Sequence, residues 1–277
     1  MKILSIDGGG ALGCGPLEFL DQMEAAGLAG ADIYAGTSVG SLLIGLALTG
    51  HSWAESVDIF GRWVGKIFPA PSIWRKANPF LPKYPSEGIE EACLSVFGNI
   101  RCNQIKMPFF IPVSDIAAGR PKIFDNSAPD LLRDVVLRST AAPSYFTPRE
   151  SKWIDGGLVA NNPSVIAIGG AIKAGADLSE LKCLSLATGG DFWKDPQIGP
   201  RTTLLGWASP LIHYGLMGGE ERDEFTADRL LKERHLRISP ALDRDYEMDD
   251  LSVLSAYRGI WRAEWDKRAP DVRTWAA

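Results

Sequence analysis

The stretch Gly36-Thr37-Ser38-Val39-Gly40 decides the fold of this chain, because it places a serine between two glycines where one element ends and another begins. An apolar, strand-like run at residues 32–35 precedes it, and a helix-like apolar run continues to about Thr49. A G-x-S-x-G sequence between a strand and a helix is typical of a nucleophile elbow, a sharp turn that exposes the serine hydroxyl. The N-terminus of the following helix favours an oxyanion at the same place. The stretch therefore predicts a nucleophilic serine on an α/β sheet.

The same order of strand, turn and helix continues on both sides of this elbow. Residues 2–6 form an apolar run that ends in Asp7-Gly8-Gly9-Gly10, and Pro16 begins a helix to about residue 26. We expect further strands at residues 107–113, 122–124, 153–154 and 183–187, and further helices at residues 131–139 and 163–174.

This alternation predicts the fold class. Strands that alternate with helices are typical of a mainly parallel central sheet with helices on both faces, an α/β/α sandwich. We expect a single domain, in which residues 1–190 form the catalytic core. Residues 191–277 are expected to form a mostly helical C-terminal portion packed on the same domain.

Composition and charge exclude several classes of protein. The 277 residues are 45% hydrophobic and 23% charged, as in an ordinary globular protein. The formal net charge of −5 argues against a general nucleic-acid binder, because phosphate binding needs a basic surface. No apolar run approaches the roughly 18 residues of a membrane span, and the N-terminus lacks the apolar core of a signal peptide. The four cysteines show neither metal-ligand spacing nor a compact disulfide framework, so we expect a reducing, cytoplasmic setting.

A serine nucleophile needs a base within hydrogen-bond reach, and histidine, the usual base, is scarce in this chain. His51 lies 13 residues after Ser38 on the same expected helix, which corresponds to roughly 20 Å at about 1.5 Å rise per residue. His213 and His235 lie in the C-terminal third, where no acid is spaced with them as a motif. We therefore expect the base to be a residue other than histidine.

Asp155 is the better candidate for the base. It ends a short expected strand and precedes Gly156 and Gly157, at a position where side chains converge at the carboxyl edge of an open α/β sheet. Burial raises the basicity of a carboxylate, so that it can act on a serine directly if geometry holds it close.

The glycine loop Gly8-Gly9-Gly10 supplies a third component. Successive backbone N–H groups before a helix form an anion-binding concavity, which suits the oxyanion of a tetrahedral intermediate. Such a loop also binds phosphate, as in sugar kinases and actin-like ATPases, where a strand ends in an aspartate followed by glycines. That alternative leaves the elbow serine unexplained. A Rossmann dinucleotide site fits less well, because no acidic residue has a clear strand position about 20 residues after the glycines.

Residues 66–84 differ from their surroundings, because they combine four prolines with aromatic and basic side chains and contain no acid. Aromatic rings sit at the headgroup level of a bilayer, beside cations that meet anionic lipid. The segment therefore suits a peripheral membrane contact or a lid, with Phe68, Trp74, Lys76 and Phe80 as the contact residues. The alternative is a long connecting loop folded onto the body of the protein.

Together these residues resemble the patatin-like phospholipase family, whose catalytic domain is shared with cytosolic phospholipase A. The matching stretches occur in the family's order and cover about residues 2–190. They are DGGGALG (7–13), GTSVGS (36–41), VSDIAAGRPKIF (113–124), AAPSYFTP (141–148), DGGLVANNP (155–163) and SLATGG (185–190).

The resemblance implies a Ser–Asp dyad without histidine. Ser38 would be the nucleophile, Asp155 the base, and the loop Gly8-Gly9-Gly10 the oxyanion hole. The supporting motif residues would be Gly13, Gly36, Gly40, Gly156 and Gly157. The chain departs from the family at Leu12, where many members carry Arg or Lys, and this leaves the headgroup preference open.

The activity implied is that of a lipid acyl hydrolase of the phospholipase A type, which forms a Ser38 acyl-enzyme from membrane lipid and needs no metal or other cofactor. One alternative is a regulated bacterial effector phospholipase, switched on by a small signal or a protein partner; proteins resembling this family include defence proteins gated by cyclic nucleotides. Two further alternatives are an actin-like nucleotide phosphotransferase and a catalytically inactive lipid-binding module.

Overall fold

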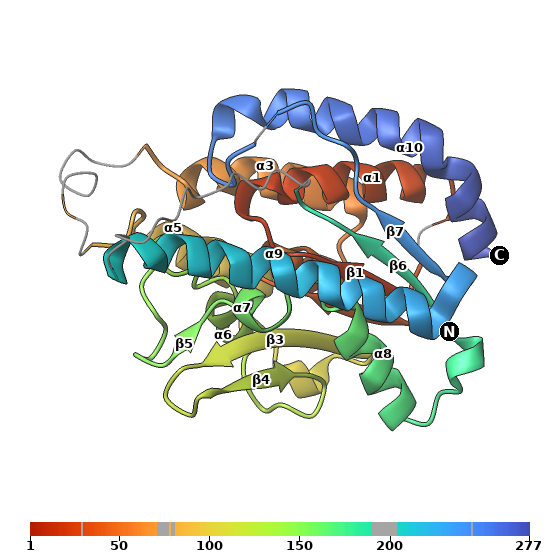
Figure 1. The fold of residues 1–277 in the computed structure, drawn as a ribbon, viewed down its shortest axis with the longest axis horizontal. Helices are drawn as coiled ribbons and strands as arrows, with labels where there is room; N and C mark the ends of the chain where they lie inside the picture. The colour runs from red at the N-terminus through yellow and green to blue at the C-terminus, as the bar shows by residue number, and fades with distance from the viewer. Residues whose placement is uncertain (29, 71–77, 79–80, 190–203, 245) are drawn as a thin grey trace.

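A central sheet of seven strands forms the middle layer of the protein (Figure 1). The computed structural model describes residues 1–28, 30–70, 78, 81–189, 204–244 and 246–277, and for residues 204–210, 212–213 and 216–218 it describes the backbone alone. The strands are β1 (Lys2–Ile6), β2 (Ile33–Gly36), β3 (Phe109–Asp115), β4 (Arg120–Phe124), β5 (Trp153–Ile154), β6 (Lys182–Leu186) and β7 (His235–Ile238).

The sheet is mostly parallel. Its strand order is β4-β3-β2-β1-β6-β7, and β5 pairs with β3 beside this path. The pairs among β3, β2, β1, β6 and β7 are all parallel, whereas β4 and β5 both run antiparallel to β3. The expected α/β class with a mainly parallel sheet is confirmed.

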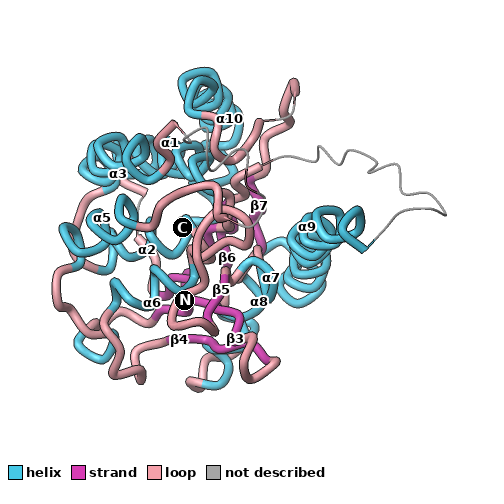
Figure 2. The backbone as a smooth tube through the Cα atoms, turned by 90° about the vertical axis from the view of Figure 1, so that its left-hand side faces the viewer, coloured by secondary structure: helices cyan, strands magenta, loops and turns pink. Residues whose placement is uncertain are grey.

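Helices cover both faces of the sheet, as Figure 2 shows from the side. The α-helices within the described residues are α1 (Cys14–Ala25), α2 (Val39–Leu48), α3 (Trp53–Ile67), α5 (Glu87–Phe97), α6 (Leu132–Ser139), α7 (Gly157–Ala160), α8 (Ser164–Lys173), α9 (Leu204–Leu231) and α10 (Leu254–Ala276). One face carries α1, α2, α3, α5 and α10, and the other carries α8 and α9. Within the described ranges, no helix is both long and apolar enough to cross a bilayer.

The alternation of side chains along each strand explains the two-sided core. In β1, Leu4 and Ile6 pack into the larger cluster with α1 and α2, while Ile3 packs into the smaller cluster with α8 and α9. Successive residues of a strand point to opposite faces, so a parallel strand covered on both sides is apolar at nearly every position. This burial on both faces explains the apolar run at residues 2–6.

The C-terminal portion contains a strand that the mostly helical expectation for residues 191–277 did not include. β7 pairs in parallel with β6 and extends the sheet beyond it. Its sequence, HLRI, is only four residues long and half polar, so it carries no readable strand period. Long α9 and α10 account for the helical character of the rest, and α10 packs along α1.

The sheet positions the functional loops at one edge. The glycine loop follows β1, the elbow follows β2, and Thr188 follows β6, all at the carboxyl ends of parallel strands. Asp155 reaches the same edge differently, because β5 is antiparallel to β3, with Ile154 opposite Ser114. Asp155 therefore follows the short strand at residues 153–154 that the sequence predicts, and the structure adds that this strand is antiparallel to β3.

Candidate active site

Ser38 stands on a strained turn between β2 and α2. Its φ of 51° and ψ of −122° lie in a backbone region that residues other than glycine rarely adopt. The turn is tight because α2 begins against the end of β1: a Cβ atom added at Gly40 would lie 2.1 Å from the Ile6 carbonyl oxygen, and one at Gly36 would lie 2.3 Å from the Gly40 carbonyl oxygen. These contacts explain why both flanking positions are glycine, and they hold the serine up at the helix N-terminus.

Ser139, at the end of α6, fixes the elbow against the loop of Asp155. Its hydroxyl accepts a hydrogen bond from the Ser38 N–H at 3.0 Å and donates one to the Pro112 carbonyl at 2.9 Å. Its own carbonyl accepts from the Gly156 N–H at 3.2 Å. One buried residue therefore ties the backbone of the nucleophile, strand β3 and the residue after the aspartate together. The sequence analysis missed Ser139, and its position just before the AAPSYFTP stretch was the available signal.

Asp155 is a buried carboxylate with one oxygen in use. Its side chain is 4% exposed, and Oδ1 accepts a hydrogen bond from the Gly157 N–H at 2.7 Å. Oδ2 is buried and has no hydrogen-bond partner of standard geometry among the described residues. Burial raises the pKa of Asp155 from 3.8 to about 6, against the opposing effects of hydrogen bonds from Gly157 and the Ser38 hydroxyl. An apo site often holds its catalytic hydrogen bond in such loose geometry until substrate binds.

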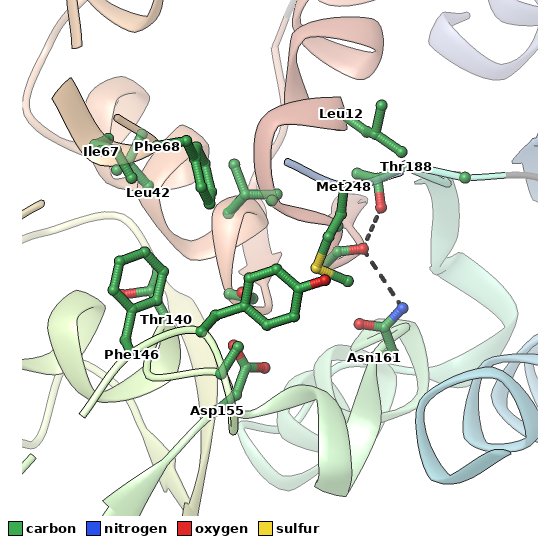
Figure 3. Close-up of a pocket in the computed structure, with 18 of the residues that line it drawn as sticks. Leu12, Leu42, Ile67, Phe68, Thr140, Phe146, Asp155, Asn161, Thr188 and Met248 are labelled. Carbon is green, nitrogen blue, oxygen red and sulfur yellow. Dashed lines mark hydrogen bonds between the residues drawn. The ribbon is translucent and has the colours of Figure 1, made fainter. Parts of the chain in front are cut away.

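The glycine loop lies directly beside the elbow. A Cβ atom at Gly8 would be 3.1 Å from the Cβ of Ser38. The Gly8 carbonyl accepts hydrogen bonds from Thr188 Oγ1 and from Asn161 Nδ2, as the dashed lines in Figure 3 show. The Gly8 N–H donates to the Asn161 carbonyl at 3.3 Å. It is therefore already occupied, which contradicts its expected place among free oxyanion donors.

Gly9 and Gly10 remain as candidate donors. Among the described residues, neither N–H group has a hydrogen-bond partner, and both glycines line the same cavity as Ser38. Gly10 has a φ of 59°, which turns the chain into the short helical turn at Gly10–Gly13. Of the three glycines in the motif, Gly9 and Gly10 therefore line the cavity with N–H groups that have no acceptor among the described residues.

The other motif glycines support this arrangement through close packing. Gly13 packs against the Val39 side chain at the start of α2, and Gly156 packs against the Pro112 carbonyl oxygen. Gly157 supplies the N–H that donates to Asp155 Oδ1. These contacts place the DGGGALG and DGGLVANNP stretches on either side of the elbow.

The cavity around Ser38 has a volume of about 470 Å³ and is largely apolar. Its walls come from α2, α3 and α5 on one side and from the loop after α6 on the other (Figure 3). The apolar lining includes Leu42, Phe60, Val64, Ile67, Phe68, Ile89 and Phe146. Such a space accommodates a hydrocarbon chain whose carbonyl carbon lies at the Ser38 hydroxyl.

The polar lining of the cavity is acidic. Besides Asp155, the carboxylates of Glu220 and Glu247 face it, and the described lining contains no Lys, Arg or His. Leu12, where the family resemblance leads us to expect Arg or Lys, also lines the cavity. Arg237 pairs with Glu220 at 2.5 Å, so Asp155 and Glu247 are the lining carboxylates without an ion pair among the described residues.

The residues expected to contact a membrane have different positions. Phe68 is 9% exposed, lies 5.3 Å from Tyr84 and 5.9 Å from Phe146 between ring centroids, and lines the cavity. In this structure it is a cavity wall and not an exposed contact residue, because its ring completes an aromatic cluster. Trp74, Lys76 and Phe80 lie outside the described residues.

Neither histidine with a described side chain lines the cavity. His51 lies beyond the end of α2 at Leu48, not on the same helix as expected, and its Nδ1 is 4.0 Å from Glu55. His235 is buried at the start of β7, with Nδ1 at 2.5 Å from Asp228. The side chain of His213 is outside the described set.

The cysteines do not provide a competing nucleophile. Cys14, Cys93, Cys102 and Cys183 are all buried and unpaired. Burial raises the pKa of the Cys14, Cys93 and Cys102 thiols to about 12, so that the reactive thiolate is scarce. In the described part of the chain, no three His, Cys, Asp or Glu side chains are grouped so as to hold a metal ion.

Comparisons with known proteins show which family and which relatives this chain is similar to. A family model described as patatin-like phospholipase matches residues 4–168. A cGAMP-activated phospholipase from Vibrio cholerae is 30% identical over 275 residues, which cover 85% of this chain and 75% of that protein. A cGAMP-activated phospholipase from Escherichia coli is 32% identical over 199 residues, which cover 61% of this chain and 55% of that protein. Among solved structures, VipD from Legionella pneumophila shares the fold, with a TM-score of 0.50 at 11% identity over 96% of this chain and 66% of that chain.

Proposed function

Because the chain belongs to the patatin-like phospholipase family, we propose that it is a lipid acyl hydrolase of the phospholipase A type, with Ser38 as nucleophile and Asp155 as base. The observation that carries this proposal is a strained elbow serine and a buried carboxylate of raised pKa on one cavity with long apolar walls. Nucleophile, base and acyl-chain space occur there together. The family also accounts for the glycine loop and the elbow at once, which the phosphotransferase alternative did not.

The reaction proceeds in two steps. Asp155 Oδ2 takes the proton of the Ser38 hydroxyl as its oxygen attacks the acyl carbonyl carbon, and the Gly9 and Gly10 amides stabilise the oxyanion. The tetrahedral intermediate collapses with cleavage of the ester bond, and Asp155 returns the proton to the departing lysolipid oxygen. Asp155 then takes a proton from water, whose oxygen attacks the acyl-enzyme carbonyl carbon. The second tetrahedral intermediate collapses with cleavage of the bond to Ser38 Oγ, to which Asp155 returns the proton, and the fatty acid is released.

The test compares wild-type protein with Ser38→Ala. We expect a tagged fluorophosphonate to label the wild type only, and mixed phospholipid vesicles to release fatty acid with the wild type only. Ser56→Ala is a matched control, because Ser56 is also a buried serine but lies in α3 and does not line the cavity. Fatty-acid release that survives Ser38→Ala would exclude Ser38 as the nucleophile.

A regulated form of the same activity is the second candidate. Two relatives carry the description cGAMP-activated phospholipase, and the first aligns over 85% of this chain. We propose that this chain is a cytoplasmic enzyme that touches the membrane peripherally and is switched on by a small molecule or a protein partner. Labelling of Ser38 without fatty-acid release, followed by release on addition of a cyclic dinucleotide, would support this candidate. Full release by the purified protein alone would exclude it.

A further inference from the structure

Glu220 of α9 contacts two groups beneath the glycine loop. Its Oε2 accepts a hydrogen bond from Asn161 Nδ2 at 3.0 Å, and its Oε1 accepts one from Arg237 at 2.5 Å. Arg237, from β7, also donates to Asp7 Oδ2 at 2.6 Å, and the Arg237 and Asp7 side chains are 8% and 0% exposed. A helix in the C-terminal portion is thus linked to Asp7 through Arg237 and to Gly8 through Asn161.

Gly8 is held through both of its backbone groups by Asn161. The Gly8 N–H donates to the Asn161 carbonyl at 3.3 Å, and the Gly8 carbonyl accepts from Asn161 Nδ2 at 3.5 Å and, more closely, from Thr188 Oγ1. Thr188 holds the carbonyl oxygen from a second side, whereas Asn161 is the partner that Glu220 reaches. Asn161 Nδ2 therefore has two acceptors, the Gly8 carbonyl and Glu220 Oε2. The position of the Glu220 carboxylate determines how the Asn161 amide is turned toward Gly8.

The planarity of the peptide bond carries this effect to the oxyanion donors. The Gly8 carbonyl and the Gly9 N–H belong to the same peptide unit, which is planar with the two groups pointing in opposite directions. Fixing the carbonyl oxygen therefore fixes the direction of the Gly9 N–H. The direction of the Gly9 N–H, a proposed oxyanion donor, is therefore set by the hydrogen bonds that the Gly8 carbonyl accepts at the other end of the same peptide unit.

The positive charge of Arg237 stabilises its contact with Glu220. Burial lowers the pKa of Arg237, but the neighbouring Asp7 and Glu220 carboxylates outweigh this effect and hold it above its ordinary value. Arg237 is therefore a permanent cation, and its charge-assisted hydrogen bond at 2.5 Å holds the Glu220 carboxylate in place.

We propose that Glu220 is a positioning residue, which aims the Gly9 amide of the oxyanion hole through Asn161 and so couples α9 to catalysis. This inference rests on the proposed function, and it assigns to a C-terminal helix a part in the reaction of the N-terminal motifs. Glu220 acts in it on the transition state, through the donor that the oxyanion requires, and not on the binding of substrate.

Glu224 supplies the matched control. It lies one helical turn after Glu220 and also contacts Arg237, with Oε2 at 3.5 Å from Nε, but it has no contact with Asn161 and does not line the cavity. Removal of either carboxylate deprives Arg237 of one neighbouring negative charge. Only the loss of Glu220 removes the contact that turns Asn161.

The experiment measures the rate of Ser38 labelling by a fluorophosphonate and kcat and KM for a short soluble ester. We expect Glu220→Ala to lower the labelling rate and kcat roughly ten- to a hundredfold at similar KM. Glu224→Ala should stay within about twofold of wild type, and Glu220→Gln, which keeps an acceptor for Asn161, should retain most activity. In the Asn161→Ala background, Glu220→Ala should cause little further loss, because the two residues act in series.

Thermal unfolding of each variant separates these effects from folding. Equal losses in Glu220→Ala and Glu224→Ala would overturn the inference, since charge compensation of Arg237 would then explain both. Multiplicative losses in the Glu220→Ala/Asn161→Ala double variant would also overturn it. Wild-type labelling without fatty-acid release, even on addition of a cyclic dinucleotide, would contradict the proposed lipid substrate alone, because the labelling rates still test Glu220. No labelling of the wild type would overturn both.

Discussion

At the scale of single residues, Asp155 combines a catalytic advantage with a cost in stability. Its carboxylate is buried, and its pKa of about 6 exceeds the ordinary 3.8. A base of this pKa is mostly ionised at neutral pH and is still more basic than an exposed aspartate. The same burial penalises the ionised form in the folded protein, so the property that makes Asp155 a base opposes folding.

The pH dependence of the reaction follows from this pKa. The proposed mechanism needs ionised Asp155, so kcat/KM should rise with pH through a midpoint near 6 and level off above it. A soluble short-chain ester, assayed between about pH 4 and pH 8, avoids effects on vesicle binding. A midpoint near 4, as for an exposed carboxylate, would contradict the role of burial.

The contribution of Asp155 to the stability of the wild-type protein should fall over the same pH range in which the activity rises. The folded-state pKa of Asp155 lies above its unfolded value, so its contribution to stability is present below about 3.8 and is lost as pH rises through about 6. At roughly 1.4 kcal/mol per pKa unit, the loss is on the order of 3 kcal/mol at pH 8. A neutral asparagine avoids this penalty and can still accept from the Gly157 N–H.

We therefore expect Asp155→Asn to have nearly no hydrolytic activity but a higher free energy of unfolding than wild type at pH 8. The advantage should vanish near pH 4, where the wild-type carboxyl is protonated as well. Urea unfolding at the two pH values measures both quantities. A variant less stable than wild type at pH 8 would show that burial is not the dominant influence on this carboxyl.

At the scale of elements, α3 determines the apolar end of the cavity. It carries a capping box, in which the Ser52 hydroxyl accepts from the Glu55 N–H and the Glu55 carboxylate accepts from the Ser52 N–H. One face of the helix turns Phe60, Val64 and Ile67 toward the cavity. A well-capped helix offers a rigid wall, and the length of chain that fits depends on the side chains along this face.

Val64→Trp should shorten the space for an acyl chain. Val64 is half-buried and lines the cavity, so a larger side chain can fill the apolar end without displacing a closed core. We expect long-chain esters to lose roughly tenfold in kcat/KM while short-chain esters change little. Arg62→Trp places the same residue on the exposed face of α3 and should change neither. Equal losses for both chain lengths would place Val64 outside the acyl path.

At the scale of the whole molecule, the cavity carries the same sign of charge as the protein. The formal net charge is −5, and Asp155 and Glu247 line the cavity without an ion-pair partner among the described residues, whereas Glu220 is paired with Arg237. Low-dielectric walls focus such a field at the mouth. Substrates with a net negative headgroup should therefore be disfavoured relative to zwitterionic ones.

Monomeric short-chain phospholipids test this preference without the effects of a membrane surface. We expect phosphatidylcholine to be hydrolysed several-fold faster than phosphatidylglycerol at low ionic strength, with a smaller difference at high salt. Glu247→Gln should reduce the difference, because Glu247 is exposed at the mouth. Faster hydrolysis of the anionic lipid, unaffected by Glu247→Gln, would contradict the electrostatic argument.

How much of this protein could be predicted from its sequence depended on how far apart along the chain the interacting residues lie. The elbow and the glycine loop were readable because strand, turn and helix follow one another within a few residues. The fold class followed from the same alternation, and the family resemblance, which is confirmed, rested on those stretches. The roles of Ser38, Asp155 and the glycines remain predictions, although the structure brings these residues together in one cavity.

The sequence by itself determined the mainly parallel sheet, the strained serine and the candidate aspartate, because local periodicity and glycine positions encode them. Only the tertiary structure decided that Asp155 arrives on an antiparallel strand, that Gly8 is already bonded to Asn161, and that Ser139 links the two catalytic loops. It also decided that β7 and α9 place Arg237 and Glu220 beneath the glycine loop. These contacts join residues up to 230 positions apart in the chain, and no local pattern specifies which distant side chains will meet.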